Sequence, residues 1–238
     1  MTRRRWIADE VHADRALLLG QNAQHLVRVL RAQVGQEFDV AADGQVRVGK
    51  IVSISDDRVE FELREAVAAG PTLDLTLLTS VFKFDRMEWA IEKATELGVA
   101  RIVPIIARRT DAHLTKAADK RVERWRRIAK EAAQQSRRLD VPEIADPAKL
   151  AEAIQKISGT RILLAETELE KTLKSRVQNV SQPVTLAFGP EGGWTEAEIR
   201  QFEAAGWATA TLGSTILRAE TAIIAAVAIA VSELSSTT

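Results

Sequence analysis

From Leu73 onward, short apolar segments typical of strands alternate with longer segments of helical periodicity. We expect strands at residues 73–81, 102–107, 161–165, 184–188 and 208–212. We expect helices at residues 86–97, 116–137, 147–157, 196–205 and 219–234, with Asp85 as the N-cap of the first. Such alternation predicts a parallel sheet covered by helices on both faces, and it limits the possible folds more than any other feature of the chain.

The first seventy residues have a different pattern, rich in short strands. Strands are expected at residues 4–8, 37–41, 46–54 and 59–63, with one helix at 23–31. The pair Asp43-Gly44 between two alternating segments is a strong hairpin signal. These features predict a small β-barrel at 1–70, a linker ending near Gly70-Pro71, and a larger α/β domain at 71–238.

Composition excludes several classes of protein. The chain has no cysteine and three histidines, which excludes disulfides and makes a zinc site improbable. Its longest apolar stretch, residues 222–231, is too short to span a membrane, and its basic start is not followed by an apolar segment. We therefore expect a cytoplasmic protein that does not insert into membranes.

Charge is distributed unevenly, although the formal net charge is zero. Residues 1–31 hold six arginines against three acidic residues, and residues 108–138 hold eleven basic residues against four acidic ones. Concentrated basic segments are typical of proteins that bind a polyanion, although a solvated helix face would also produce them. The candidate nucleic-acid contacts are Arg3, Arg4, Arg5, Arg124, Arg127, Arg137 and Arg138. Trp125 has apolar neighbours at helical spacing, which favours a core position over base stacking.

The densest local signal is a glycine-rich loop, Phe188-Gly189-Pro190-Glu191-Gly192-Gly193-Trp194-Thr195. It follows an apolar strand and precedes a helix that opens with a Thr195…Glu198 capping box. Ligands bind beyond the carboxyl ends of parallel strands, and glycines let a ligand approach the backbone closely. A tight strand-to-helix turn would need the same glycines, so the loop alone leaves both interpretations open.

Two further loops follow strands of the same domain. The segment 212–222 carries Arg218 and Glu220 just ahead of an apolar helix, and residues 79–83 follow the first strand. Together the three loops predict one composite site. The glycine patterns of dinucleotide-binding folds and P-loops are absent, which argues against a conventional Rossmann methyltransferase or a nucleoside triphosphatase.

Several motifs together resemble the bacterial ribosomal RNA small-subunit methyltransferase E family. The resemblance rests on Gly189-Pro190-Glu191-Gly192-Gly193 and on Leu217-Arg218-Ala219-Glu220-Thr221-Ala222. It extends to residues 83–88, 92–99 and 131–138, and to His25, Leu30-Arg31 and Asp43-Gly44 near the start. It therefore covers nearly the whole chain in order, and the combination is more specific than any single motif.

The resemblance implies a PUA-like RNA-binding barrel followed by a SPOUT domain with a deep trefoil knot. It implies S-adenosylmethionine as the cofactor and a homodimer formed through the knot domain. The residues implied in cofactor binding are Thr79, Phe188, Gly189, Glu191, Gly192, Leu212, Gly213, Ile216 and Leu217. Ser214-Thr215 departs from related sequences, which often have an arginine there.

The implied reaction is methylation of uridine N3 in small-subunit ribosomal RNA, either naked or within the assembled 30S subunit. The chain has no cysteine nucleophile of the kind commonly used for methylation at pyrimidine C5, which leaves N3 or a ribose oxygen as the target. We expect Arg218 to stabilise charge on the base and Glu220 to orient Arg218 or accept the proton, with Glu191 and Lys83 as lesser candidates. A ribose 2′-O-methyltransferase and a non-catalytic RNA-binding factor are the alternatives.

Overall fold

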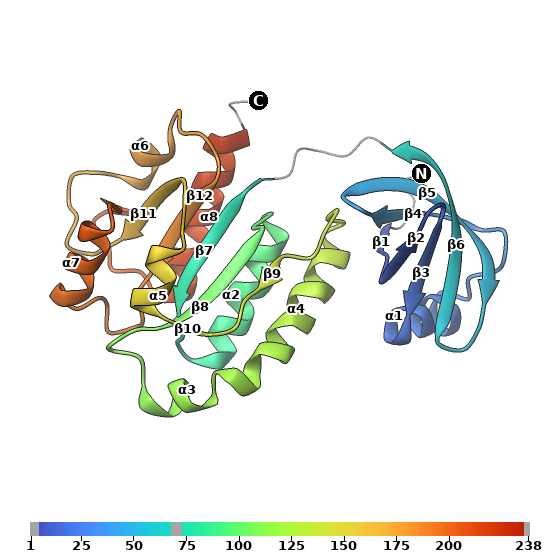
Figure 1. Ribbon diagram of the computed structural model, residues 1–238, viewed down its shortest axis with the longest axis horizontal. Coiled ribbons are helices and arrows are strands. Elements are labelled where there is room, and N and C mark those ends of the chain that lie inside the picture. The colour runs from blue at the N-terminus through green and yellow to red at the C-terminus, as the bar shows by residue number, and fades with distance from the viewer. Residues whose placement is uncertain (1–4, 68–72, 236–238) are drawn as a thin grey trace. The chain divides into compact units, whose positions relative to one another are not determined.

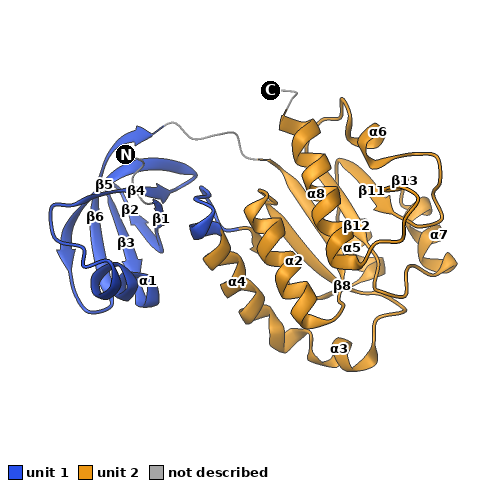
Figure 2. Cartoon of the chain, turned by 180° about the vertical axis from the view of Figure 1, so that it is seen from behind, with its two compact units in different colours: residues 1–70, 133–141 blue, residues 71–132, 142–238 orange. Residues whose placement is uncertain are grey.

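The computed structural model describes residues 5–67 and 73–235. The chain forms two compact units: residues 1–70 with 133–141, and residues 71–132 with 142–238 (Figure 2). The segment 133–141, which begins in the last turn of helix α4 (Val122–Gln135), therefore packs with the first unit, although in sequence it lies between two stretches of the second unit. Within the described ranges, no helix combines the length and apolar character needed to cross a bilayer.

The first unit is a six-stranded sheet curled into a half-barrel (Figure 1). The strand order is β1-β4-β5-β6-β3-β2, with only β1 and β4 parallel. The strands are β1 (Arg5–Ile7), β2 (Glu10–His12), β3 (Arg15–Leu19), β4 (Glu37–Ala42), β5 (Gln45–Ile54) and β6 (Arg58–Val67). One short helix, α1 (Gly20–Gln24), continues into a π-helical turn at His25–Val29.

The predicted hairpin at Asp43-Gly44 is confirmed. Ala42 pairs with Gln45, and both turn residues have positive φ angles of 50° and 72°, as a two-residue type I′ turn requires. The predicted helix at 23–31 is wrong in its bounds, because the helix begins at Gly20 and its second half has π-helical hydrogen bonds. The hairpin formed by β2 and β3 was not predicted, since its turn at Ala13-Asp14 lacks a glycine.

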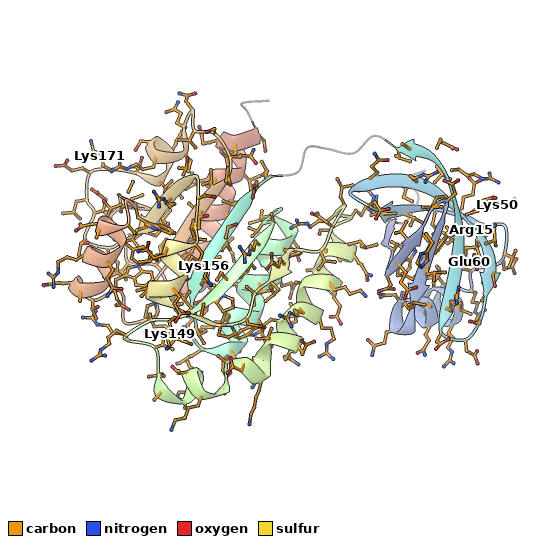
Figure 3. The ribbon with its side chains drawn as sticks, in the orientation of Figure 1. Arg15, Lys50, Glu60, Lys149, Lys156 and Lys171 are labelled. Carbon is orange, nitrogen blue, oxygen red and sulfur yellow. The ribbon has the colours of Figure 1, made fainter. Side chains whose placement is uncertain are left out.

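The core of the first unit lies on one face of the sheet. Leu18, Val40, Ile51 and Phe61 are buried there together with Leu26 from the helical segment. On its other side, Ala133 and Val141 pack against Ile7 and Ala41, which explains why residues 133–141 belong to this unit. Ion pairs on the surface link neighbouring strands of this sheet. One example is Arg15 on β3 with Glu60 on β6, 3.8 Å apart (Figure 3).

The second unit contains a seven-stranded sheet in which every pairing is parallel, as the alternating pattern predicted. The order is β10-β8-β7-β12-β11-β13, and β9 also pairs with β8. The strands are β7 (Leu75–Ser80), β8 (Arg101–Ile106), β9 (Glu143–Ile144), β10 (Ala148–Lys149), β11 (Thr160–Leu164), β12 (Val184–Phe188) and β13 (Ala208–Ala210).

Helices cover both faces of this sheet. Helices α2 (Phe84–Glu96) and α8 (Ala219–Ser235) pack side by side on one face (Figure 2). On the other face, α5 (Leu150–Gln155) and α7 (Glu196–Ala204) pack against Leu78, Leu163 and Ala187. The remaining helices are α3 (Ala112–Ala117), α4 (Val122–Gln135) and α6 (Leu173–Val177).

Two predicted helices of this unit are wrong. The expected helix at 116–137 is interrupted by a 3-10 turn at Asp119–Arg121, between α3 and α4. Leu114, Ala118 and Val122 are all buried, so the apolar spacing continues through the break and concealed it in the sequence. The helix expected at 147–157 begins only at Leu150, because Ala148–Lys149 pair with β8. Trp125 lies in the core, as predicted.

Pro104 lies within β8 and has no amide hydrogen to donate to a neighbouring strand. It pairs with Thr79 on one side, while on the other side β9 pairs with residues 101–102 and β10 with 105–106. The sheet pairing is therefore interrupted beside the residue that lacks an amide hydrogen.

Candidate functional site

The sheet register brings the three predicted loops to one edge. Phe188 pairs with Thr79, so β12 and β7 end side by side. On the other side of β12, Leu163 pairs with Ala187 and Leu164 with Ala210, which adds the ends of β11 and β13. The four strands are neighbours in the sheet, and their following loops therefore share one region, as the sequence predicted.

The first loop follows β7, a strand that is buried along its whole length. Thr79 and Ser80 are buried, and the Ser80 hydroxyl finds no hydrogen-bond partner within the described ranges. The Lys83 amide donates to Glu191 Oε1 at 3.4 Å, which links this loop to the glycine-rich loop. Lys83 is also the N-cap of α2, so the predicted cap Asp85 is wrong and Asp85 lies in the first helical turn.

The glycine-rich loop is held tightly by the protein itself. A Cβ atom at Gly189 would lie 3.3 Å from the Trp194 indole, and one at Gly192 would lie 3.3 Å from Arg109. Gly193 has a φ of 68°, and its amide closes a turn on the Pro190 carbonyl at 2.8 Å. Side chains at Gly189 and Gly192 would thus be crowded by the loop's own packing, and Gly193 has a backbone conformation that favours glycine.

Two side chains that the sequence analysis did not single out anchor this loop. The Arg109 guanidinium donates to the carbonyl oxygens of Gly192 at 2.6 Å and Trp194 at 3.2 Å. The Trp194 indole donates to the Leu164 carbonyl at 3.1 Å and packs edge-on against Phe202. The only sequence signal for Arg109 is that it follows the end of β8.

The predicted capping box at the start of α7 is confirmed. Glu198 Oε2 accepts from the Thr195 amide at 2.8 Å and from its hydroxyl at 2.7 Å. The other oxygen of Glu198 accepts from the Arg108 amide at 2.7 Å. One buried carboxylate thus joins the loop after β8 to the loop after β12.

The third loop is more exposed. Gly213 has a φ of 127°, and a Cβ there would meet nothing within 4 Å. Its amide donates to the Thr211 hydroxyl at 3.2 Å, and that hydroxyl donates to the Gly213 carbonyl at 3.0 Å. Leu212 and Leu217 are half-buried, whereas Ile216 has 83% of its surface exposed.

Arg218 and Glu220 stand at the start of α8, where the Arg218 carbonyl accepts the helix's first backbone hydrogen bond from Ala222. Arg218 is exposed, while Glu220 is only 8% exposed. The ion pair that Glu220 forms is with Arg86 on α2, at 3.7 Å. Arg218 and Glu220 thus line one cavity, and Arg86 is an additional cation that the sequence analysis did not assign.

The predicted nucleic-acid contacts differ in their surroundings. Arg124 is held by Glu88 at 2.7 Å, whereas Arg127 lies 3.9 Å from Glu131 with both side chains exposed. The other five fall at the start of the chain and after α4. Arg3 and Arg4 lie outside the described residues.

The Arg5 guanidinium donates to the Arg137 carbonyl, which places the Arg5 side chain beside the segment that follows α4. Arg138 is 11% exposed at its side chain and lies 3.4 Å from Asp140. Burial lowers the pKa of Arg138 despite this partner. Arg137, in contrast, is exposed.

The loops fit S-adenosylmethionine by their chemistry. The buried Ser80 hydroxyl, which has no partner among the residues that the structure describes, the exposed residues around Gly213 and the exposed aliphatic side chain of Ile216 would suit a ligand with both polar and apolar parts. Within the described residues, no cluster of three or more histidine or acidic side chains could hold a metal ion.

Comparison with known proteins agrees with this site. A family model described as an RNA methyltransferase domain matches residues 69–231, and one described as an RNA methyltransferase PUA domain matches residues 18–64. The fold and the strand-end loops thus define a two-domain RNA methyltransferase.

Two relatives narrow the assignment. Ribosomal RNA small subunit methyltransferase E of Bacillus subtilis is 33% identical over 86% of this chain and 85% of its own length. Its namesake from Synechocystis is 36% identical over 86% of this chain and 68% of its own length. The chain belongs to the ribosomal RNA small subunit methyltransferase E family.

Solved structures give the same result. The structure of the Neisseria gonorrhoeae enzyme of this name, bound to S-adenosylmethionine, has a TM-score of 0.82 at 29% identity and covers 96% of both chains. A methyltransferase from Legionella pneumophila, also with bound S-adenosylmethionine, has a TM-score of 0.83 at 25% identity and covers 97% of both chains. S-adenosylmethionine is accordingly the cofactor of this chain.

Proposed function

We propose that this chain methylates N3 of one uridine in small-subunit ribosomal RNA, in the cytoplasm. The observation that carries the proposal is the convergence of three strand-end loops beside Arg218 and the buried carboxylate of Glu220. This arrangement combines a cofactor site with a cation and an acceptor, which are the two groups that uridine N3 needs for activation.

The cofactor is held by the residues identified from the sequence. Thr79 and Phe188 form the floor at the strand ends, and the loops that carry Glu191 and Gly213 flank them. The further members of the set are Gly189, Gly192, Leu212, Ile216 and Leu217. We further propose that the chain threads these loops into the trefoil knot that the SPOUT resemblance implies.

When bound, S-adenosylmethionine would supply a methyl group attached to a positively charged sulfur. As the electron pair of uridine N3 bonds to the methyl carbon, the sulfur–carbon bond breaks and its electrons stay on the sulfur. Uridine N3 carries a weakly acidic proton, which must leave before that pair is available. Glu220 accepts this proton, because it is a buried carboxylate with one oxygen lacking a hydrogen-bond partner within the described ranges. Arg218 stabilises the negative charge that then spreads over O2 and O4.

The RNA contacts lie on each unit separately. On the second unit, Arg127 is the exposed candidate, whereas Arg124 is already paired with Glu88. On the first unit, Arg137 is exposed. Both cations suit phosphate oxygens, and the substrate is small-subunit ribosomal RNA or the 30S subunit that contains it. The chain acts as a homodimer formed through its second unit.

A reconstitution assay tests this proposal. Purified protein, S-adenosylmethionine and small subunits lacking the modification are incubated, and the RNA is digested to nucleosides for mass spectrometry. We expect 3-methyluridine to accumulate to at most one per subunit. Accumulation of a 2′-O-methylated nucleoside would contradict the N3 assignment, and no methylation despite cofactor binding would favour a non-catalytic RNA-binding factor.

A further inference from the structure

A cavity of about 350 Å³ lies where helices α2 and α8 begin. Both helices follow strand-end loops of the proposed cofactor site, and they pack side by side on the same face of the sheet (Figure 2). The cavity is therefore beside that site and separate from its glycine-rich loop. Its lining residues are Asp85, Arg86, Trp89, Arg218, Glu220 and Thr221.

The cavity is lined by both hydrogen-bond donors and hydrogen-bond acceptors. Arg86 and Arg218 contribute guanidinium groups, which only donate, and Glu220 contributes a carboxylate, which accepts when ionised. Glu220 is 8% exposed, its Oε1 lies 3.7 Å from Arg86, and its Oε2 has no hydrogen-bond partner within the described ranges. A buried acceptor without a donor is costly unless a ligand supplies the donor.

An aromatic side chain completes the cavity. Trp89 lies on α2 one turn beyond Arg86 and is 47% exposed. Indole rings half-open to solvent are well suited to stack on a nucleobase, because every base has an apolar face. Indole, guanidinium and carboxylate groups around one cavity match a flat polar ring better than a phosphate, which would be repelled by Glu220 and Asp85.

We propose that this cavity is the uracil-recognition pocket of the enzyme. The pairing edge of uracil presents an acceptor at O4, a donor at N3 and an acceptor at O2. The pocket offers groups of the complementary kind: guanidinium donors from Arg86 and Arg218 for the two carbonyl oxygens, the Glu220 acceptor for the N3 hydrogen, and Trp89 to stack on the ring. The proposal rests on the proposed function and adds Arg86 and Trp89 as specificity-determining residues.

The same arrangement rejects cytosine. Cytosine has a bare acceptor at N3 and an amino group at N4, so it would place a lone pair against Glu220 and a donor against an arginine. One well-formed base contact gives discrimination of about 5- to 150-fold against the wrong base.

Binding of two matched RNA fragments separates the roles of these side chains. One fragment carries the unmethylated uridine at the target position, which is located beforehand by nucleoside mapping. The other fragment has cytidine at that position. Affinity is measured by fluorescence anisotropy with S-adenosylhomocysteine in place of S-adenosylmethionine, so that the uridine fragment is not methylated during the measurement. Binding of S-adenosylmethionine to each variant is measured separately by calorimetry. We expect the wild-type chain to prefer the uridine fragment.

The variants should lose different parts of this preference. Trp89→Ala should weaken binding of both fragments about 5- to 150-fold, because stacking does not depend on which base is present. Trp89→Phe should retain most of the affinity for both fragments. Arg86→Ala should weaken binding of the uridine fragment alone, and Arg86→Lys should restore part of the preference. Glu220→Gln should narrow the preference mainly by strengthening binding of the cytidine fragment, because its amide nitrogen can donate to the bare N3 of cytosine. Arg200→Ala removes a cation of a helical ion pair far from the cavity lining and should change neither fragment.

Three results would overturn the proposal. One is an unchanged preference for uridine in both Arg86→Ala and Glu220→Gln. Another is a wild-type chain that binds both fragments equally. A third is a shift of Trp89→Ala from dimer to monomer in sedimentation with normal RNA affinity, which would assign Trp89 to a contact between copies. A wild-type chain without cofactor binding or methylation would instead refute the proposed function on which the pocket rests.

Discussion

The two loops of the second unit at residues 189–194 and 212–218 both contain glycine and both follow a strand, but they differ in how they are held. Side chains of the protein brace the first loop, since Arg109, Trp194 and Glu198 bond to it or to its neighbours. The second has open space around Gly213 and an exposed Ile216. The same position after a strand therefore does not imply the same role: the first loop is a frame braced by side chains, and the second presents its side chains outward.

Trp194→Ala should have the largest effect on stability, because it removes a buried indole from the frame. We expect a loss of about 3–5 kcal/mol in unfolding free energy, and the Leu164 carbonyl would lose its indole donor. Urea unfolding followed by circular dichroism measures this. A loss below about 1 kcal/mol, the usual scale for surface changes and single hydrogen bonds, would contradict the description of this loop as a frame.

Arg218→Ala should leave the fold intact and strongly reduce methylation. Loss of a donor that stabilises developing charge typically lowers turnover about 100- to 1000-fold, and the side chain is exposed, so stability should change little. Single-turnover methylation and thermal unfolding on the same preparation measure both quantities. Wild-type turnover in this variant would remove Arg218 from the reaction.

Gly213→Ala tests the second loop from the backbone side. No atom lies within 4 Å of the added methyl group, but the φ of 127° is one that residues with a Cβ rarely adopt. We expect the unfolding free energy to fall by about 1–3 kcal/mol unless the loop changes its conformation. We also expect weaker cofactor binding in calorimetry. Unchanged stability and affinity would show that the loop does not need this conformation.

Ile216→Ala should show most clearly that the second loop contributes to cofactor binding and not to stability. Because Ile216 is 83% exposed, its truncation should alter unfolding free energy by no more than about 0.5 kcal/mol. Cofactor affinity should nevertheless fall several-fold, since the side chain is proposed to cover the ligand. Equal affinity for S-adenosylmethionine in wild-type and variant chains would exclude that role.

The smallest expected effect concerns Glu168, on the loop after β11. Hydrogen bonds from the Thr209 hydroxyl and from the amides of Glu170 and Lys171 lower the pKa of Glu168 to about 2. A lowered folded-state pKa gives stability that is present above the unfolded value of about 4.3 and is lost as the pH falls towards the folded value.

Wild type should therefore exceed Glu168→Gln in stability at neutral pH, and the difference should shrink between about pH 4.3 and the folded pKa of about 2. Urea unfolding of both chains at several acidic pH values measures it. A difference that stays constant over this range would contradict the assigned pKa.

Much of this organisation could be predicted from sequence. The parallel sheet follows from alternating apolar segments, and the Thr195…Glu198 box and the Asp43-Gly44 hairpin follow from local rules that use only neighbouring residues. The order of strands and the pairing of Phe188 with Thr79 depend on tertiary packing, and sequence could supply only the expectation that strand ends gather.

The errors have physical causes. The 3-10 turn before α4 keeps the same apolar spacing as a helix, so periodicity could not reveal it. Arg86 was missed because its partner Glu220 is more than a hundred residues away, and its own surroundings are those of an ordinary helix start. Arg109 was missed for the same reason, since it bonds to carbonyl groups of a distant loop.

The most direct test of the account is nucleoside mass spectrometry of small-subunit ribosomal RNA from cells that lack this gene and from cells in which it is restored. The account predicts that 3-methyluridine is lost on deletion, returns with the wild-type gene and stays absent with the Arg218→Ala gene. An unchanged level of 3-methyluridine on deletion, or loss of a ribose-methylated nucleoside in its place, would contradict it.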